Sequence, residues 1–165
     1  MRTFLLINLI LWLSTCQTAK LLEASEPKLL FGGGQLTEGP AVDEAGYLYF
    51  SDQPNDVIRR ISPEGEVEIF LQPSGVTNGM AFDYQGRLLM CQSNEGNYPE
   101  NPAAAGRRIA RREADGSITV LADSYEGKPF IGPNDLCQDK QGRIYFTDPY
   151  YPESGVEKSQ PVSGV

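Results

Sequence analysis

A unit of fifteen residues occurs three times in this chain, and it limits the folds that the chain can adopt more than any other feature. The copies begin at Glu38, Asn78 and Asn134, and each carries Asp at its sixth position and Gly at its ninth, before an apolar run. Successive copies start 40 and 56 residues apart. A repeat of this length is typical of propellers and solenoids, in which each repeat folds as one supersecondary unit.

Each copy predicts two short strands joined by a D-x-x-G turn, and a second hairpin follows in the first two copies. The expected strands are residues 40–42, 47–50, 57–61 and 67–71, then 80–82, 87–91, 107–112 and 117–121, then 136–137 and 143–146. Four consecutive antiparallel strands form one blade of a β-propeller. A further short strand is expected at residues 28–31, and no segment after residue 19 has a helical periodicity.

We therefore predict an all-β fold in which residues 28–165 form about two and a half N-terminal blades of a β-propeller. Propellers need about four to eight blades to close their ring. The chain is accordingly expected to be truncated at its C-terminus and to represent the front of a protein about twice its length.

The N-terminus has the pattern of a secretory signal. Residues 1–19 combine the basic residue Arg2, a short apolar core and a run of small and polar residues. This core is too short to span a bilayer, so a cleaved signal peptide is expected rather than a membrane helix. The protein is thus predicted to be secreted or periplasmic, with a lipid anchor at Cys16 as the alternative. Residues 20–27 form a polar leader.

The composition excludes several kinds of site. The chain contains no histidine, which excludes Ser-His-Asp and Cys-His catalysis and every histidine-ligated metal site within it. Its formal net charge is −8, so it lacks the basic surface that nucleic-acid binding requires, and we expect no nucleic-acid partner. An acidic surface is compatible with a bound cation.

The first position of the repeated unit is the best candidate for such a cation site. The first strand of each propeller blade lines the central channel, so Glu38, Asn78 and Asn134 can point toward a common axis. One carboxylate and two amide carbonyls form an all-oxygen ligand set, which suits a hard cation such as Ca²⁺. The alternative is that these residues belong to ordinary turns, where Asn and Gly are also frequent.

Other acidic residues that recur in the repeats are interpreted as structural. Asp43, Asp83 and Asp139 occupy the same turn position in every copy, which hairpin geometry explains. Asp52 and Asp148 end the second strand of their repeats and are expected to cap loops, with support of the site as the alternative.

The two cysteines beyond the signal segment offer no evidence of a disulfide. Cys91 and Cys137 hold different positions in the repeated unit, the fourteenth and the fourth. Nothing in the sequence brings their thiols together. Both are interpreted as buried small hydrophobic residues.

Three short motifs resemble the senescence marker protein/gluconolactonase family. They are Glu38-Gly39-Pro40, Pro133-Asn134-Asp135-Leu136 and Tyr145-Phe146-Thr147-Asp148-Pro149. The family includes gluconolactonases, regucalcin and, more distantly, diisopropyl fluorophosphatase, and the likeness runs from about residue 28 to residue 165. The resemblance implies a six-bladed β-propeller with one divalent cation in its channel. Ca²⁺ is the expected ion, with Zn²⁺, Mg²⁺ or Mn²⁺ as alternatives.

The resemblance also implies roles for individual residues. Glu38 and Asn134 match the metal-binding Glu and Asn of the family, whereas Asn78 matches a position that faces the substrate, coordinates the metal or lies in a turn. Asp135 is expected to orient a ligand or hold the end of its strand, with a solvated turn residue as the alternative. The remaining ligands and the general acid or base are expected beyond Val165. The chain alone is therefore expected to be inactive.

The predicted activity is the hydrolysis of sugar lactones. A divalent cation polarises the lactone carbonyl for attack by water, so no nucleophilic side chain is needed. Two other functions remain open at this point: a non-catalytic propeller that binds a ligand, and metal-dependent hydrolysis of phosphotriesters. The later blades would separate the three, because they supply the missing ligands and most of the pocket walls.

Overall fold

The computed structural model describes residues 26–93, 106–152, 158–161 and 163–164. The predicted signal peptide, Cys16 and most of the longest predicted loop, which runs from residue 94 to residue 106, lie outside the described residues. The strands are β1 (Thr37–Val42), β2 (Leu48–Asp52), β3 (Val57–Ile61), β4 (Val67–Leu71), β5 (Thr77–Phe82), β6 (Leu88–Gln92), β7 (Arg108–Arg112), β8 (Ile118–Ala122), β9 (Ser124–Tyr125), β10 (Lys128–Pro129), β11 (Leu136–Gln138) and β12 (Ile144–Phe146). A three-residue 3₁₀ turn, η1 (Gln53–Asn55), follows β2.

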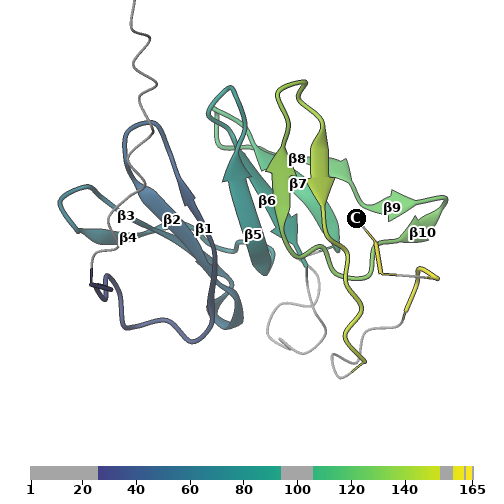
Figure 1. The fold of residues 1–165 in the computed structure, drawn as a ribbon, viewed down its shortest axis with the longest axis horizontal. Coiled ribbons are helices and arrows are strands. Elements are labelled where there is room, and N and C mark those ends of the chain that lie inside the picture. The colour runs from purple at the N-terminus through teal and green to yellow at the C-terminus, as the bar shows by residue number, and fades with distance from the viewer. Residues whose placement is uncertain (1–25, 94–105, 153–157, 162, 165) are drawn as a thin grey trace, which may run out of the picture.

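Two four-stranded antiparallel sheets dominate the structure, with strand orders β1-β2-β3-β4 and β5-β6-β7-β8. The two-stranded sheet β11-β12 stands beside the second of them, and the small hairpin β9-β10 lies near it (Figure 1). In each large sheet the strands follow one another in chain order, which is the connectivity of a propeller blade. The all-β prediction is confirmed, and the part of the chain that the structure describes contains no α-helix. It also contains no helix long and apolar enough to cross a membrane.

The recurring Asp of the repeated unit closes the hairpin turn, as predicted. The Oδ1 atom of Asp83 accepts the backbone N–H groups of Gln85 and Arg87, each at 2.9 Å. Asp139 does the same for the residues two and four positions further on, and Asp43 accepts the N–H of Tyr47. The Gly that follows has a positive φ in all three turns, a conformation in which a side chain is strained. These Asp side chains are therefore structural.

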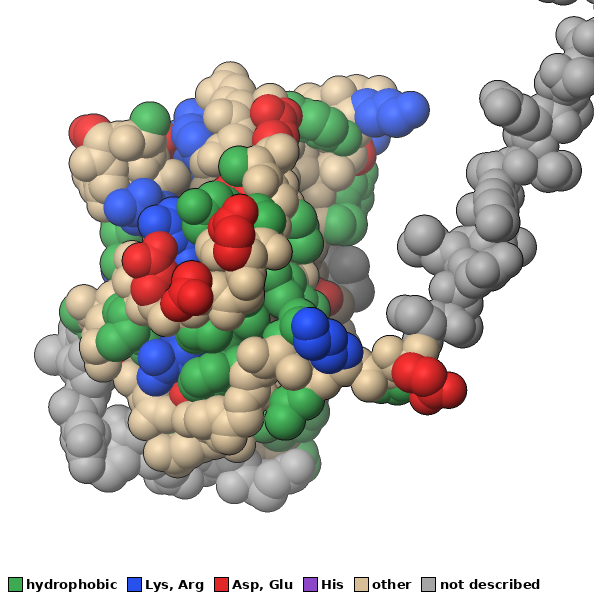
Figure 2. Space-filling model, turned by 90° about the vertical axis from the view of Figure 1, so that its left-hand side faces the viewer, with side chains coloured by type: hydrophobic (Ala, Val, Ile, Leu, Met, Phe, Trp, Pro, Cys, Tyr) green, Lys and Arg blue, Asp and Glu red, His purple; other side chains and the backbone are tan. Residues whose placement is uncertain are grey.

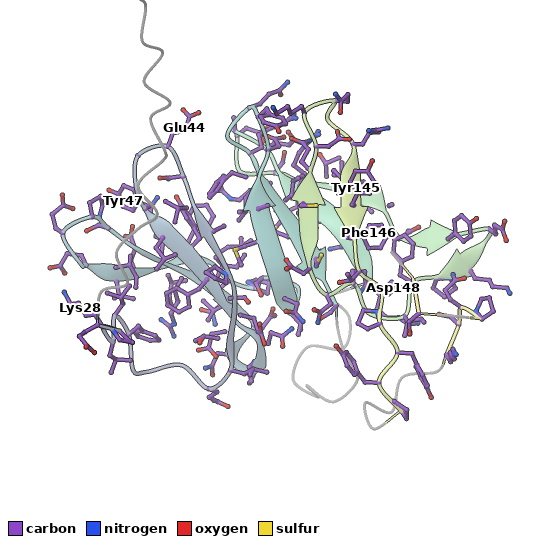
Figure 3. All side chains as sticks on the ribbon, viewed as in Figure 1. Lys28, Glu44, Tyr47, Tyr145, Phe146 and Asp148 are labelled. Atoms are coloured by element: carbon purple, nitrogen blue, oxygen red, sulfur yellow. The ribbon has the colours of Figure 1, made fainter. Side chains whose placement is uncertain are left out.

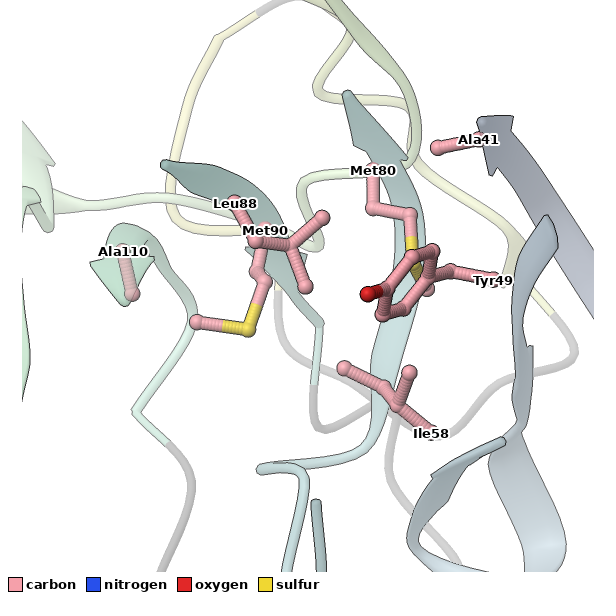
Figure 4. Close-up of a cluster of buried hydrophobic side chains, with 7 residues drawn as sticks. All are labelled: Ala41, Tyr49, Ile58, Met80, Leu88, Met90 and Ala110. Carbon is pink, nitrogen blue, oxygen red and sulfur yellow. The ribbon is translucent and has the colours of Figure 1, made fainter. Parts of the chain in front are cut away.

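The main hydrophobic core lies between the two large sheets. Figure 4 shows Tyr49 and Ile58 of the first sheet facing Met80, Leu88 and Met90 of the second. Successive residues of a strand point to opposite faces. The other two apolar residues of β6, Leu89 and Cys91, accordingly pack on the far side against Leu136. Because β6 is buried on both faces, its sequence is a continuous apolar run rather than an alternating one.

The two cysteines differ in their surroundings, so one of the two predictions was wrong. Cys91 is fully buried in the second core, and the burial raises the pKa of its thiol. Cys137 is exposed. It pairs across the strands with Tyr145, as Ala41 does with Tyr49 in the first repeat. The second sheet covers the Ala41 pair, whereas no described strand covers the pair at Cys137.

The residue at the end of the second strand anchors the loop that leads into the same blade. Asp52 accepts the backbone N–H groups of Gln35 and Leu36. Asp148 accepts those of Ile131 and Gly132, with the shortest contact at 2.7 Å. In the second sheet Gln92 holds this place, and its side-chain N–H donates to the carbonyl of Ser74. The prediction that Asp52 and Asp148 cap loops is confirmed.

Replacing Asp148 by Ala is expected to lower the free energy of unfolding by about 3 kcal/mol. Asp148 is buried, and its loss would leave two buried backbone N–H groups without an acceptor, each worth about 1–3 kcal/mol. Urea unfolding measures the change. The matched control is Asp123→Ala in the same loop, because Asp123 is exposed and, among the described residues, its side chain bonds to the neighbouring Ser124. A similar loss in both variants would contradict the anchoring role.

The segment before β1 departs from the prediction, because residues 28–31 do not form a strand. Phe31 instead packs on Phe50, with ring centroids 5.4 Å apart, and the guanidinium of Arg59 lies over its ring. The Phe31 side chain, one of the apolar residues of the expected strand, thus packs on the outer face of the first sheet without forming a strand. On the side of the molecule that Figure 2 shows, acidic, basic and apolar side chains are interspersed.

Candidate functional site

The first strands of adjacent sheets approach so closely that no side chain fits between them. A Cβ atom placed on Gly39 would lie 2.5 Å from the carbonyl oxygen of Asn78. A Cβ atom on Gly79 would lie 2.6 Å from the carbonyl oxygen of Asn134. Real Cβ atoms do not approach other atoms to these distances. Asn78 and Asn134 supply the carbonyl groups of these two contacts, and Glu38 directly precedes Gly39. The structure therefore places the backbones of all three residues next to one another along one line.

Hydrogen bonds hold this line of backbone in place. The N–H of Gly79 donates to the carbonyl of Asn134 at 2.7 Å, which joins the second repeat to the third. The hydroxyl of Ser51 lies 2.9 Å from the carbonyl oxygen of Asn78 and 3.2 Å from that of Glu38. We call the three side chains at the first position of the repeated unit, those of Glu38, Asn78 and Asn134, the first-position column.

The side chains of the first-position column make no hydrogen bond or ion pair with any other residue that the structure describes. Asn78 is only 7% exposed, but its amide is not a buried unsatisfied group, since among the described residues the buried side-chain atoms without a hydrogen-bond partner are Arg59 Nε and Arg112 Nε. Asn134 is half-buried and Glu38 is exposed. By contrast, the recurring Asp residues of the turns and strand ends all have partners. The column thus offers three oxygen-bearing side chains that no other described residue binds.

Asp135 differs from the column in both its exposure and its contacts. It is exposed, and its Oδ1 atom accepts the N–H of Leu136 at 2.8 Å. Its own N–H donates to the hydroxyl of Thr147. A Cβ atom on Gly79 would collide with the Asp135 carboxylate. Asp135 therefore lies beside the column, and its role in orienting a ligand stays a prediction.

The chemistry of the column fits part of the coordination shell of a hard cation. Carboxylate and amide oxygens are the ligands that Ca²⁺ prefers, and Ca²⁺ takes about six to eight of them. The three side chains can supply only some of these. Among the residues that the structure describes, no three His, Cys, Asp or Glu side chains lie close enough together to hold a metal. Further ligands would have to come from other residues or from water.

A cavity of about 220 Å³ between the first two sheets lies away from the column. It is lined by residues of the hairpin turns, such as Asp43 and Glu113, and by the rings of Tyr49 and Phe70. Asp43 follows the end of β1, whereas Glu38 lies at its start. The cavity is therefore at the opposite end of the strand, and its two carboxylates already have partners.

Two features of the site were not identified from the sequence. One is the close backbone approach at Gly39 and Gly79, and the other is the bridging hydroxyl of Ser51. A signal for the first was present, since Gly occupies the second position of the unit in two copies. Ser51 occupies the fourteenth position, where the other copies have Cys91 and Thr147. No comparable pattern distinguishes it.

Comparison with known proteins gives a consistent result. The family model described as the SMP-30/Gluconolactonase/LRE-like region matches residues 36–164. A gluconolactonase from Zymomonas mobilis is 30% identical over 154 residues, which cover 84% of this chain and 40% of that protein. The family match therefore includes the twelve strands that the structure describes and the whole first-position column.

Two solved structures are similar over most of the chain. A gluconolactonase from Xanthomonas campestris is 33% identical, with a TM-score of 0.65, and the match covers 82% of this chain and 42% of that one. A candidate gluconolactonase of known structure is 31% identical, with a TM-score of 0.68, and the match covers 82% of this chain and 46% of that one. The chain thus spans less than half the length of each of these relatives.

Proposed function

Because the chain belongs to the SMP-30/gluconolactonase/LRE-like family, we propose that it forms part of a metal-dependent lactonase that opens sugar lactones. The proposed complete fold is a six-bladed β-propeller, of which the two four-stranded sheets and β11-β12 are successive blades. The N-terminal pattern of residues 1–19 supports export from the cytoplasm as part of this proposal.

The observation that carries the proposal is the unused first-position column. Its three oxygen-bearing side chains come from three repeats and lie along one line of closely packed backbone. They have no partner among the described residues, whereas the structural Asp residues of the same repeats do. Side chains that only shaped turns would be expected to bond to the backbone nearby, as Asp43, Asp83 and Asp139 do.

Glu38 and Asn134 are the proposed cation ligands. The Glu38 carboxylate supplies the one negative charge of the column, and the Asn134 carbonyl supplies a neutral oxygen. A bound Ca²⁺, or Zn²⁺, Mg²⁺ or Mn²⁺ in its place, would provide Lewis acidity toward the carbonyl oxygen of a lactone. Asn78 has both an acceptor and two donors, so its amide can hold the cation or bind a hydroxyl of the sugar.

Glu38 carries the one group of the column that could transfer a proton, because the other two members are amides. The proposal assigns its carboxylate to the cation. Asp135 lies next to the column and is exposed, and we assign it a supporting role at the start of β11. The general acid or base is therefore proposed to come from the remaining part of a longer protein, as are the other cation ligands.

Removal of divalent cations is expected to abolish lactone hydrolysis by the complete protein. The test measures acid release from glucono-δ-lactone in a pH-stat, after treatment with EDTA and again after addition of Ca²⁺. The spontaneous rate without protein is subtracted. We expect loss of at least about 100-fold and recovery with the cation, given the size of metal-ion effects on such reactions.

Full activity in the presence of the chelator would contradict metal dependence. Hydrolysis of a phosphotriester in preference to the lactone would assign the site to the other hydrolytic function. A protein that binds Ca²⁺ but acts on neither substrate would instead be a binding module.

A further inference from the structure

Ser51 is a buried hydroxyl between two residues of the first-position column. It lies in β2, is 0% exposed and pairs across the strands with Glu38. Its Oγ atom is 2.9 Å from the carbonyl oxygen of Asn78, in the next sheet, and 3.2 Å from that of Glu38, in its own. The single hydroxyl proton is therefore shared between two carbonyl groups that belong to different blades.

The contact is a direct polar link between the first two sheets at the level of the column. Within the described parts of the chain, no backbone hydrogen bond joins β1 to β5. The next junction is built differently, because the Gly79 N–H donates directly to the Asn134 carbonyl. Burying a hydroxyl costs free energy unless it is hydrogen-bonded. A buried serine at this interface is thus explained by the two carbonyl groups that accept its hydroxyl proton.

The equivalent residues in the other repeats do not form such a bridge. Cys91 is fully buried, and its thiol makes no hydrogen bond with another described residue. The hydroxyl of Thr147 accepts the N–H of Asp135, which belongs to its own blade. The hydrogen bond that links the first two members of the column therefore comes from a side chain, and it adds to the close backbone packing at Gly39, whereas the hydrogen bond between the second and third members comes from the backbone.

We propose that Ser51 is a positioning residue that fixes Glu38 relative to Asn78 and so sets the cation affinity of the site. The inference rests on the proposed cation site. The two column side chains have no partners among the described residues, so their separation is determined by the backbone that carries them. Metal sites require their ligands to be held within about 0.5 Å of the productive geometry. A bridge between the two carbonyl groups restricts the backbone in this way before the cation arrives.

Substitution of Ser51 by Ala and by Cys separates this role from simple packing. Ser51→Ala removes the hydroxyl, and Ser51→Cys keeps a side chain of similar size with only a weak donor. We expect both variants of the complete protein to bind Ca²⁺ about 10-fold more weakly in calorimetric titration, the lower end of the effect of residues that orient metal ligands. If Ser51 only filled space, Ser51→Cys would restore the affinity.

The control is Cys91→Ala, at the same position of the next repeat. It removes a buried side chain that has no hydrogen bond to a described residue, so it should lower the melting temperature of the cation-free protein without changing its Ca²⁺ affinity. Ser51→Cys keeps the measurement informative if Ser51→Ala does not fold.

Each outcome is decisive. Affinity within twofold of the wild type in both Ser51 variants would overturn the positioning role while leaving the proposed cation site intact. An equal loss of affinity in Cys91→Ala would show that any change in the core weakens the site, which would also overturn it. A wild-type protein that binds no Ca²⁺ would refute the cation site itself, and this inference with it.

Discussion

Replacing Glu38 by Gln in the complete protein is expected to lower its affinity for Ca²⁺ by about 100-fold or more. The substitution keeps the shape of the side chain and removes the one negative charge of the first-position column. Calcium affinity depends strongly on the number of charged ligands, and the range among protein sites covers several orders of magnitude. Isothermal titration calorimetry measures the affinity directly, and lactone hydrolysis should fall with it.

The same substitution should leave the stability of the cation-free protein nearly unchanged. Glu38 is exposed, and its side chain makes no hydrogen bond with a described residue, so its replacement belongs to the class of surface changes that alter stability by about 0.5 kcal/mol or less. A variant that lost cation binding because it unfolded would show a lower melting temperature. Binding and unfolding are thereby distinguished in one pair of measurements.

Glu44→Gln is the matched control for this substitution. Glu44 is also exposed and lies at the tip of the β1-β2 hairpin, at the other end of the strand that carries Glu38 (Figure 3). The two variants have the same change in net charge. If both lowered Ca²⁺ affinity alike, the effect would come from the overall charge of the protein rather than from a site. Stoichiometric Ca²⁺ retained by Glu38→Gln would remove Glu38 from the proposed ligands.

Gly79→Ala is expected to lower the free energy of unfolding by about 3 kcal/mol, the upper part of the range for overpacked interiors. The added methyl group would collide with the Asp135 carboxylate and would lie 2.6 Å from the backbone of Asn134 and Asp135. Because backbone atoms cannot turn aside as a flexible side chain can, the second and third repeats would have to separate. The same displacement should weaken Ca²⁺ binding, since it moves Asn134 away from Asn78.

Gly86→Ala provides the comparison, since it introduces the same methyl group without a collision. Gly86 lies in the β5-β6 turn with a φ of 72°, and apart from its two chain neighbours no described residue comes within 4 Å of the place that its methyl carbon would occupy. Its cost is the conformational strain alone, about 1 kcal/mol, and Ca²⁺ affinity should not change. Urea unfolding of the two variants shows which of them loses more free energy of unfolding, and we expect the larger loss in Gly79→Ala. A larger loss in Gly86→Ala would show that close approach of the strands does not limit the residue at position 79.

The repeated unit predicted the sheets well because its signals are local. An Asp that bonds to N–H groups two and four residues further on, followed by Gly, determines a hairpin without reference to the rest of the fold. The alignment of the three copies then placed Glu38, Asn78 and Asn134 at equivalent positions. The structure brings their backbones together, and their role as ligands stays a prediction.

Features that depend on how two sheets meet could not be predicted in this way. Ser51 and Asn78 are 27 residues apart, and no periodicity links a hydroxyl in one strand to a carbonyl in the next sheet. Cys137 occupies a position that is buried in the first repeat and exposed in the third, because burial depends on the neighbouring sheet. Phe31 was assigned to a strand on its apolar character, whereas it packs on Phe50 without one.

The anchored loops also determine where a repeat must begin if it is to be duplicated or grafted into another protein and still fold. Asp52, Gln92 and Asp148 each bind backbone that precedes the first strand of their own blade. A duplication that began at the first strand would leave the buried Asp148 carboxylate without the N–H groups of Ile131 and Gly132, and would leave Asp52 with the Asn55 amide but without Gln35 and Leu36. Burying a carboxylate that has lost its donors is costly. The smallest transferable segment therefore starts before the strand, near Gln35, Ser74 or Ile131. Grafts designed between members of the family should place their junctions upstream of these residues.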